Sequence, residues 1–139
     1  MINTQTIYLT EVTDLGPEAA EFFGADLMIL FAEGAPEELA EISVIHRPSE
    51  VREAPPAPGD VLVLGEHELR ITAVGEKAWK NVLDLGHAVF KFSGLSEAEL
   101  PGEIHTEAPQ GLDLASVIVP GARIEIKGVP KDQPEAGGN

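Results

Sequence analysis

The four histidines of this chain are the residues best suited to chemistry near neutral pH. An imidazole has an ordinary pKa of about 6.5, so it can act as a nucleophile, a base or a metal ligand without strong tuning. The chain has no cysteine, which excludes thiol catalysis, disulfides and cysteine-ligated zinc or iron–sulfur clusters. His46 stands out because it ends the apolar segment "ISVIH" and is followed directly by Arg47.

The pattern around His46 predicts a short strand over residues 41–46 with His46 at its end. His46 shares strand parity with Ile42 and Val44, so its side chain starts on their face and leaves the sheet where the strand stops. The guanidinium of Arg47 matches the geometry of a phosphate, which makes Arg47 a candidate for binding an anionic group there. A surface histidine beside a loop gives the same pattern, so the residues alone leave both interpretations open.

The other histidines have simpler structural interpretations. His67 alternates in phase with the apolar positions of 69–73, which predicts an inward tilt at the edge of the core. His87 follows Gly86, where an imidazole can cap the carbonyls at the end of a helix. His105 lies in a turn-rich segment and has no evident task. The sequence contains no local metal-ligand spacing, so we expect no metal site and no cofactor unless the fold gathers the histidines.

The segments that must position these histidines are mostly strands. Runs of β-branched and apolar residues between turn residues predict strands at 4–13, 26–32, 41–46, 60–64, 67–74, 87–93, 116–119 and 123–127. Helices are predicted at 17–23, 36–40 and 76–85, the last with Gly86 as a left-handed cap. The short intervals between turns favour a β-sandwich or a barrel, so we expect a mainly β fold with a few short helices.

Length and composition predict a single domain. The chain has 139 residues, of which 43% are hydrophobic, and this suffices for one core. Residues 130–139 consist mostly of proline, glycine and polar residues. We therefore expect a folded domain over 1–129 and a disordered tail over 130–139.

The net charge of −15 restricts the classes of partner. An acidic surface repels the phosphates of nucleic acids and of anionic lipids, so neither is an expected partner. A partner with a basic patch would be attracted instead. No apolar run approaches the ~20 residues of a membrane span, and no export signal marks the N-terminus. We expect a cytoplasmic protein without direct membrane insertion.

Several motifs occur together and in a fixed order. They are "EGAP" at 33–36, "AVG" at 73–75, "LGH" at 85–87 and "FSGLSEAELPG" at 92–102. With them the chain resembles, over nearly its whole length, the glucitol/sorbitol-specific IIA component of the phosphoenolpyruvate-dependent sugar phosphotransferase system. The resemblance implies a cytoplasmic, mainly β, barrel-like protein.

The same resemblance implies a phosphoryl carrier. One histidine accepts a phosphoryl group from the phosphocarrier protein HPr and passes it to a cysteine of the IIB component, whose membrane partner IIC moves and phosphorylates the sugar. The family's phosphorylated histidine falls in an "F-I-H" segment that corresponds to "VIH" at 44–46, so the resemblance assigns the phosphohistidine to His46. His67 and His87 match histidines common in the family and are candidates for orienting His46 or contacting the phosphoryl oxygens.

One departure from the family pattern leaves an alternative open. The family tends to continue after the histidine with a second histidine and a glycine, whereas this chain continues with Arg47, Pro48 and Ser49. Pro48 removes a backbone donor and Ser49 replaces a permissive glycine. A non-catalytic regulatory or binding module with the same fold is therefore the alternative. The actual sugar cannot be predicted, because it binds the membrane component.

The position of Arg47 also allows an expectation about charge. A phosphoryl group on His46 adds about two negative charges to a chain that is already strongly acidic. Arg47 is the nearest cation in the sequence, and a solvated arginine on the surface is the other interpretation. On the first of these we expect Arg47→Ala to slow phosphoryl acceptance roughly tenfold.

Overall fold

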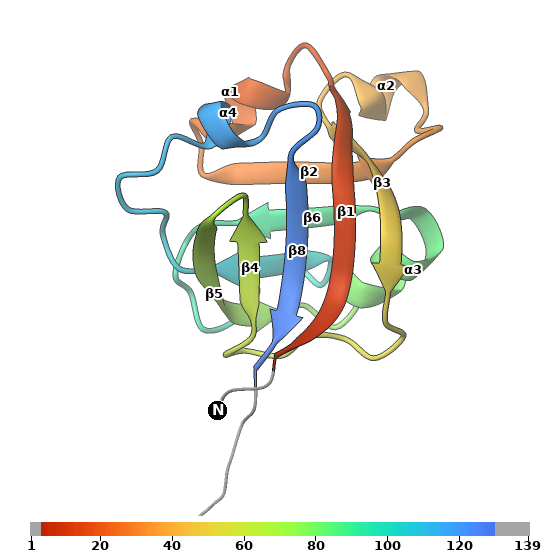
Figure 1. The fold of residues 1–139 in the computed structure, drawn as a ribbon. Coiled ribbons are helices and arrows are strands. Elements are labelled where there is room, and N and C mark those ends of the chain that lie inside the picture. The colour runs from red at the N-terminus through yellow and green to blue at the C-terminus, as the bar shows by residue number, and fades with distance from the viewer. Residues whose placement is uncertain (1–3, 130–139) are drawn as a thin grey trace, which may run out of the picture.

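The computed structural model describes residues 4–129, and its main feature is a closed barrel of eight strands (Figure 1). The strands are β1 Gln5–Leu15, β2 Leu27–Ala32, β3 Val44–Val51, β4 Val61–Leu64, β5 His67–Val74, β6 Ala88–Lys91, β7 Glu103–Thr106 and β8 Arg123–Gly128. The helices are α1 Ala19–Phe23, α2 Glu37–Ala40, α3 Ala78–Leu85 and α4 Leu114–Val117. The expectation of a mainly β, barrel-like fold with a few short helices is confirmed.

The order of strands around the barrel is β1-β3-β2-β6-β7-β5-β4-β8, and β8 closes the ring by pairing with β1. Figure 1 shows these two strands, red and blue, side by side at the front of the molecule. The pairs β2–β3 and β6–β7 are parallel, and the other neighbours are antiparallel. A closed sheet leaves no long edge exposed, so its interior can be filled with side chains.

The interior is built mainly from aliphatic side chains, and the fully buried aromatic residues are Phe90 and Phe92, as expected from a chain with 5% aromatic residues. Side chains that alternate inward along the strands form one core cluster, which α3 joins through Trp79 and Val82. The largest fully buried side chains are Ile7, Met28, Leu30, Leu62, Leu64, Ile71, Phe90, Phe92, Ile104, Ile118, Ile124 and Ile126. None of the helices in residues 4–129 is long and apolar enough to cross a membrane.

β3 differs from its prediction, because it continues through Pro48 to Val51 and does not end at His46. β2 pairs with β3 only as far as His46, so Pro48 lies where β3 has a strand partner on one side. The register with β1 also shifts here: Leu9 faces Glu50 and Thr10 faces Pro48, which leaves Ser49 as the extra residue. Prolines within sheets are confined to such one-sided or bulged positions, because a proline cannot donate to the ladder.

Two further elements differ from the sequence prediction. The strand expected at 116–119 is wrong, since this segment overlaps α4, whose first turn is capped by the carboxylate of Asp113 accepting from the Ala115 N–H at 3.2 Å. β7 was not predicted, because Glu103 and His105 make the segment look polar although all four of its residues are buried. The tail expected at 130–139 lies outside the described residues.

Candidate functional site

The structure places His46 inside the barrel. It is the third residue of β3, it pairs with Val12 of β1 on one side and with Ala32 of β2 on the other, and none of the residue is exposed (0%). Strand alternation turns Val44 and His46 inward while Arg47 points outward. The expectation that His46 escapes from the sheet at a strand end is therefore wrong, because the strand continues past it.

Two hydrogen bonds fix the ring of His46. Nδ1 lies 2.6 Å from the hydroxyl oxygen of Thr10, and Nε2 lies 2.7 Å from the carbonyl oxygen of Gly86. A carbonyl can only accept, so Nε2 carries the proton and Nδ1 of the neutral ring accepts from the Thr10 hydroxyl. Burial lowers the pKa of His46, while the bond to Gly86 and the nearby Glu33 carboxylate act in the opposite direction. The resting ring is therefore a neutral imidazole with its lone pair on Nδ1.

Gly86 owes its place over His46 to the end of α3. It adopts the left-handed conformation (φ 63°, ψ 26°) and its N–H bonds the carbonyls of the last helical turn, so the predicted glycine cap is confirmed. A methyl group added to Gly86 would lie 2.5 Å from Cβ of Ala32 on β2. Glycine thus meets two requirements here, the left-handed backbone and a close approach to the sheet, and the approach brings its carbonyl to His46.

His87 lies next to the carbonyl that holds His46, and it is half-buried. Its Nδ1 lies 3.1 Å from the carbonyl oxygen of Leu30, to which it donates, and its ring packs on Phe31 with the ring centres 5.0 Å apart. The expectation that this imidazole caps α3 is wrong, because its partner is a carbonyl of β2. His87 nevertheless directly follows Gly86, whose carbonyl binds His46.

Arg47 points to the outer face of the barrel. Its Nε and Nη2 donate to the two carboxylate oxygens of Glu33 at 2.9 and 3.0 Å, and both side chains are largely exposed. This pair lowers the pKa of Glu33. The guanidinium and the imidazole of His46 therefore lie on opposite faces of β3, and the structure does not bring them together.

His67 is also separate from His46. It is the first residue of β5, faces Leu64 across the β4–β5 hairpin and is exposed, so its predicted inward tilt is wrong. In the barrel β8 and β1 lie between the β4–β5 hairpin and β3. His67 is therefore no part of the His46 site in this structure.

His105, to which the sequence assigned no task, is fully buried in a hydrogen-bonded network. Its Nε2 lies 2.9 Å from a carboxylate oxygen of Glu103 and its Nδ1 lies 2.6 Å from the hydroxyl of Ser93. The same Glu103 oxygen accepts the N–H of Leu100 at 3.1 Å. The network ties both ends of segment 93–101 to β7, and the unpredicted strand is the reason that sequence reasoning missed it.

Part of this network also has the composition of a metal site. Donor atoms of Glu99, Glu103 and His105 all lie within 4.8 Å of one another. Lys91 already supplies positive charge there, with its Nζ 2.9 Å from Glu99 and 3.8 Å from Glu103. The cluster is satisfied by protein groups, so it gives no reason to invoke a metal ion.

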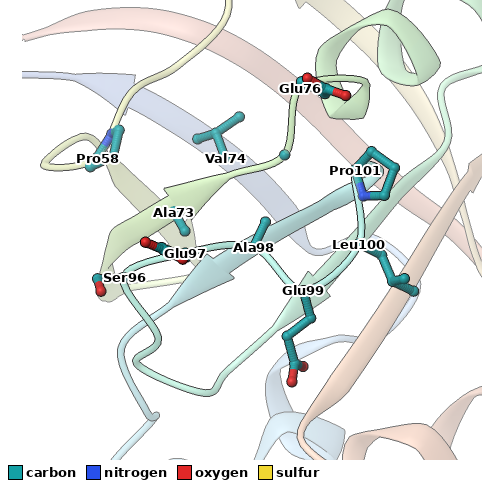
Figure 2. A pocket seen from close by; sticks show the side chains of 11 residues that line it. Pro58, Ala73, Val74, Glu76, Ser96, Glu97, Ala98, Glu99, Leu100 and Pro101 are labelled. Atoms are coloured by element: carbon teal, nitrogen blue, oxygen red, sulfur yellow. The ribbon is translucent and has the colours of Figure 1, made fainter.

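A surface hollow of about 500 Å³ lies beside segment 96–101 (Figure 2). The close-up shows the carboxylates of Glu76 and Glu97 on different sides of it. Its walls are formed by Pro58, Ala73, Val74, Gly75, Glu76, Ser96, Glu97, Ala98, Glu99, Leu100 and Pro101. No histidine is among these described residues, so the hollow is distinct from the His46 site.

Comparison with known proteins gives one consistent result. Residues 7–125 match the family "PTS system glucitol/sorbitol-specific IIA component". Similar curated proteins are the "PTS system glucitol/sorbitol-specific EIIA component" of Shigella flexneri and that of Escherichia coli (strain K12). Each is 38% identical over 123 residues, covering 88% of this chain and 96% of the relative. The solved structure "The Crystal Structure of PTS System IIA Component from Enterococcus faecalis V583" is 26% identical with a TM-score of 0.68, covering 84% of this chain and 96% of that chain.

Proposed function

Because the chain belongs to the family of glucitol/sorbitol-specific IIA components of the phosphotransferase system, we propose that His46 is the histidine on which it carries the phosphoryl group. A IIA component of this family is a phosphoryl carrier in sugar uptake that works through a histidine intermediate, as the motifs indicated. The system to which it belongs includes HPr and the IIB and IIC components. We propose HPr as the donor, IIB as the acceptor and glucitol or sorbitol as the transported sugar.

Two properties of His46 support its assignment. The motif "VIH" at 44–46 corresponds to the segment that holds the family's phosphorylated histidine. The ring is also neutral and oriented by Thr10 and Gly86, and a neutral imidazole can supply the lone pair for in-line attack on phosphorus once the Gly86 carbonyl has turned away from Nε2. The fixed ring in a chain of this family is the observation that carries the proposal.

Transfer requires a change at Gly86, because a ring with no exposed surface cannot meet a donor. Nε2 points at the Gly86 carbonyl, which lies in a turn between the exposed Leu85 and the half-buried His87. Nδ1 points at Thr10, which is buried on β1. We therefore assign the phosphoryl group to Nε2, after the carbonyl has turned away from it. His87 must move with this turn, which gives it a supporting role.

The burial of His46 also favours a second candidate function. A chain that kept the barrel but never opened the Gly86 turn would be the non-catalytic regulatory or binding module, with His46 as a core residue. The two functions differ in whether any histidine becomes phosphorylated.

The test is incubation with phosphoenolpyruvate, enzyme I and HPr, followed by mapping of the label. We expect one acid-labile, base-stable phosphoryl group per chain, located at His46 by mass spectrometry of the wild-type protein. His46→Gln should abolish the label, whereas the matched variant His67→Gln, changed at an exposed position, should keep it. Near-UV circular dichroism checks that both variants are folded. A label on another histidine would refute the assignment, and no label at all would favour the non-catalytic module.

A further inference from the structure

We propose that Thr10 is a positioning residue for this reaction, because its hydroxyl can hold His46 in either of two tautomers. The inference rests on the proposed phosphorylation of His46 at Nε2. In the resting protein the Thr10 hydroxyl donates to Nδ1, and in the reactive and phosphorylated forms it accepts from Nδ1–H. By accepting from Nδ1–H, the Thr10 hydroxyl stabilises the tautomer in which the proton is on Nδ1 and Nε2 has the lone pair for attack.

The resting geometry holds the wrong tautomer for attack by Nε2. The Gly86 carbonyl lies 2.7 Å from Nε2 and keeps a proton there, so the lone pair is on Nδ1. Attack at Nε2 needs the opposite arrangement, with the lone pair on Nε2 and the proton on Nδ1. A carbonyl cannot adapt to that change, because it has no proton to give.

Thr10 can adapt because a hydroxyl both donates and accepts. Its oxygen lies 2.6 Å from Nδ1, and both residues are buried, with 1% of Thr10 and 0% of His46 exposed. At such a site an Nδ1–H without an acceptor would be an unpaired buried donor, which disfavours this tautomer. Rotation of the Thr10 hydroxyl avoids this cost without moving any heavy atom.

Thr10 is held well enough to perform this task. It lies within β1, which is bonded to β3 on one side and to β8 on the other, and its register partners are Pro48 and Ile124. The ring of Tyr8 packs edge-on against His46 with the ring centres 6.1 Å apart, which restricts the imidazole from another side. Hydroxyl and ring therefore remain opposite each other while the Gly86 turn moves.

Before transfer, once the Gly86 turn has opened, Nε2 releases its proton to solvent and Nδ1 takes up one from solvent, so the tautomer changes with no net change in protons. The bond between phosphorus and the ring nitrogen of the donor phosphohistidine breaks, and its electron pair stays with the donor nitrogen. The bond between phosphorus and Nε2 of His46 forms from the Nε2 lone pair. During the transfer the proton on Nδ1 stays there, and Nδ1–H donates a hydrogen bond to the hydroxyl oxygen of Thr10.

The experiment compares Thr10→Val, which removes the hydroxyl at nearly constant shape, with Thr10→Ser, which retains it. We expect Thr10→Val to accept the phosphoryl group from HPr at least tenfold more slowly than wild type, and Thr10→Ser to restore most of the rate. Thr13→Val is the matched control on the same strand, because the Thr13 hydroxyl bonds the carbonyl oxygen of Ile45 at 3.4 Å and the carboxylate of Glu33 rather than the ring of His46. Thr13→Val should react like wild type.

Nitrogen-15 spectra of the histidine side chains give a second measurement that needs no variant. The resting wild-type protein should show His46 protonated at Nε2, and the phosphorylated protein should show phosphorus on Nε2 and a proton on Nδ1. Label on His46 at Nδ1, or equal rates for Thr10→Val and wild type, would overturn the role of Thr10 while leaving the phosphoryl carrier intact. Absence of label from His46 in wild type would instead overturn the proposed function. If Thr10→Val does not fold, the wild-type spectra alone decide.

Discussion

Replacement of Gly86 by alanine tests the turn that covers His46. The residue has a φ of +63°, and an alanine in this left-handed conformation costs roughly 1–2 kcal/mol. The added methyl would also lie 2.5 Å from Cβ of Ala32, a separation that the structure must relieve by shifting α3 from β2. Overpacking of this kind costs typically 1–3 kcal/mol. We therefore expect Gly86→Ala to lower the free energy of unfolding by about 2–5 kcal/mol.

Gly65 provides a matched control within the same chain. It also has a φ of +63°, in the β4–β5 hairpin, but a methyl group added there meets nothing within 4 Å. Gly65→Ala should therefore lose only the backbone contribution, about 1–2 kcal/mol. The difference between the two variants measures the contact with Ala32.

Urea unfolding of the two variants, of Ala32→Gly and of the Gly86→Ala/Ala32→Gly double variant completes the test. Ala32→Gly removes the opposing methyl. The loss of free energy of unfolding in the double variant should therefore be smaller than the two single losses added together, by about 1–3 kcal/mol. Equal losses at Gly86 and Gly65, or additive losses in the double variant, would refute the proposed close packing of this turn on β2.

Four further predictions concern the remaining polar groups. Since burial lowers the pKa of His46, the unfolded chain binds this proton at a pH where the folded chain does not. Stability from the neutral ring should be complete above about pH 6.5 and decline as pH falls toward the lowered pKa, with a flatter urea-unfolding profile for His46→Gln. Glu103→Leu should cost about 2–4 kcal/mol in urea unfolding, because His105 and Leu100 lose their acceptor, whereas Glu99→Gln at an exposed ion pair should cost clearly less. Tyr8→Phe should leave thermal stability unchanged or higher, since the buried hydroxyl has no hydrogen-bond partner in the described residues; a clear loss would reveal one. Arg47→Ala should slow phosphoryl acceptance less than the tenfold expected from sequence, because its guanidinium binds Glu33 on the outer face; a tenfold loss in HPr-dependent labelling would contradict this placement.

Sequence reasoning succeeded where local chemistry determines structure. The clean alternation of residues 123–127 predicted β8, and the apolar face followed by Gly86 predicted α3 with its left-handed cap. It failed at β7, since the polar groups of Glu103 and His105 bond each other and also Ser93 and Leu100 of the preceding segment. Local patterns carry no information on such distant partners.

The candidate site shows the same division. The sequence identified His46, but its burial depends on β1 pairing along β3 beyond the histidine, and a proline at position 48 argued locally against that strand. Thr10 lies 36 positions from His46 and Gly86 lies 40 positions away, so neither contact could be anticipated from spacing. Arg47 was misplaced for a related reason, because a strand end was expected where alternation in fact continues.

The pairing of β1 with β8 has a consequence for how the barrel forms. Gln5 faces Gly128 across this pair, so closure joins segments from near opposite ends of the described chain. Such contacts of long sequence separation slow folding, because the entropy of ordering the intervening chain is lost before they form. During synthesis β1 must therefore wait for the last strand to leave the ribosome, and until then its β8-facing edge is open to misassociation. The same closeness of the two strands makes circular permutation feasible: a short linker joining β8 to β1, with new ends cut at the exposed hairpin around Gly65, would preserve every strand pair while making the β1–β8 contact local.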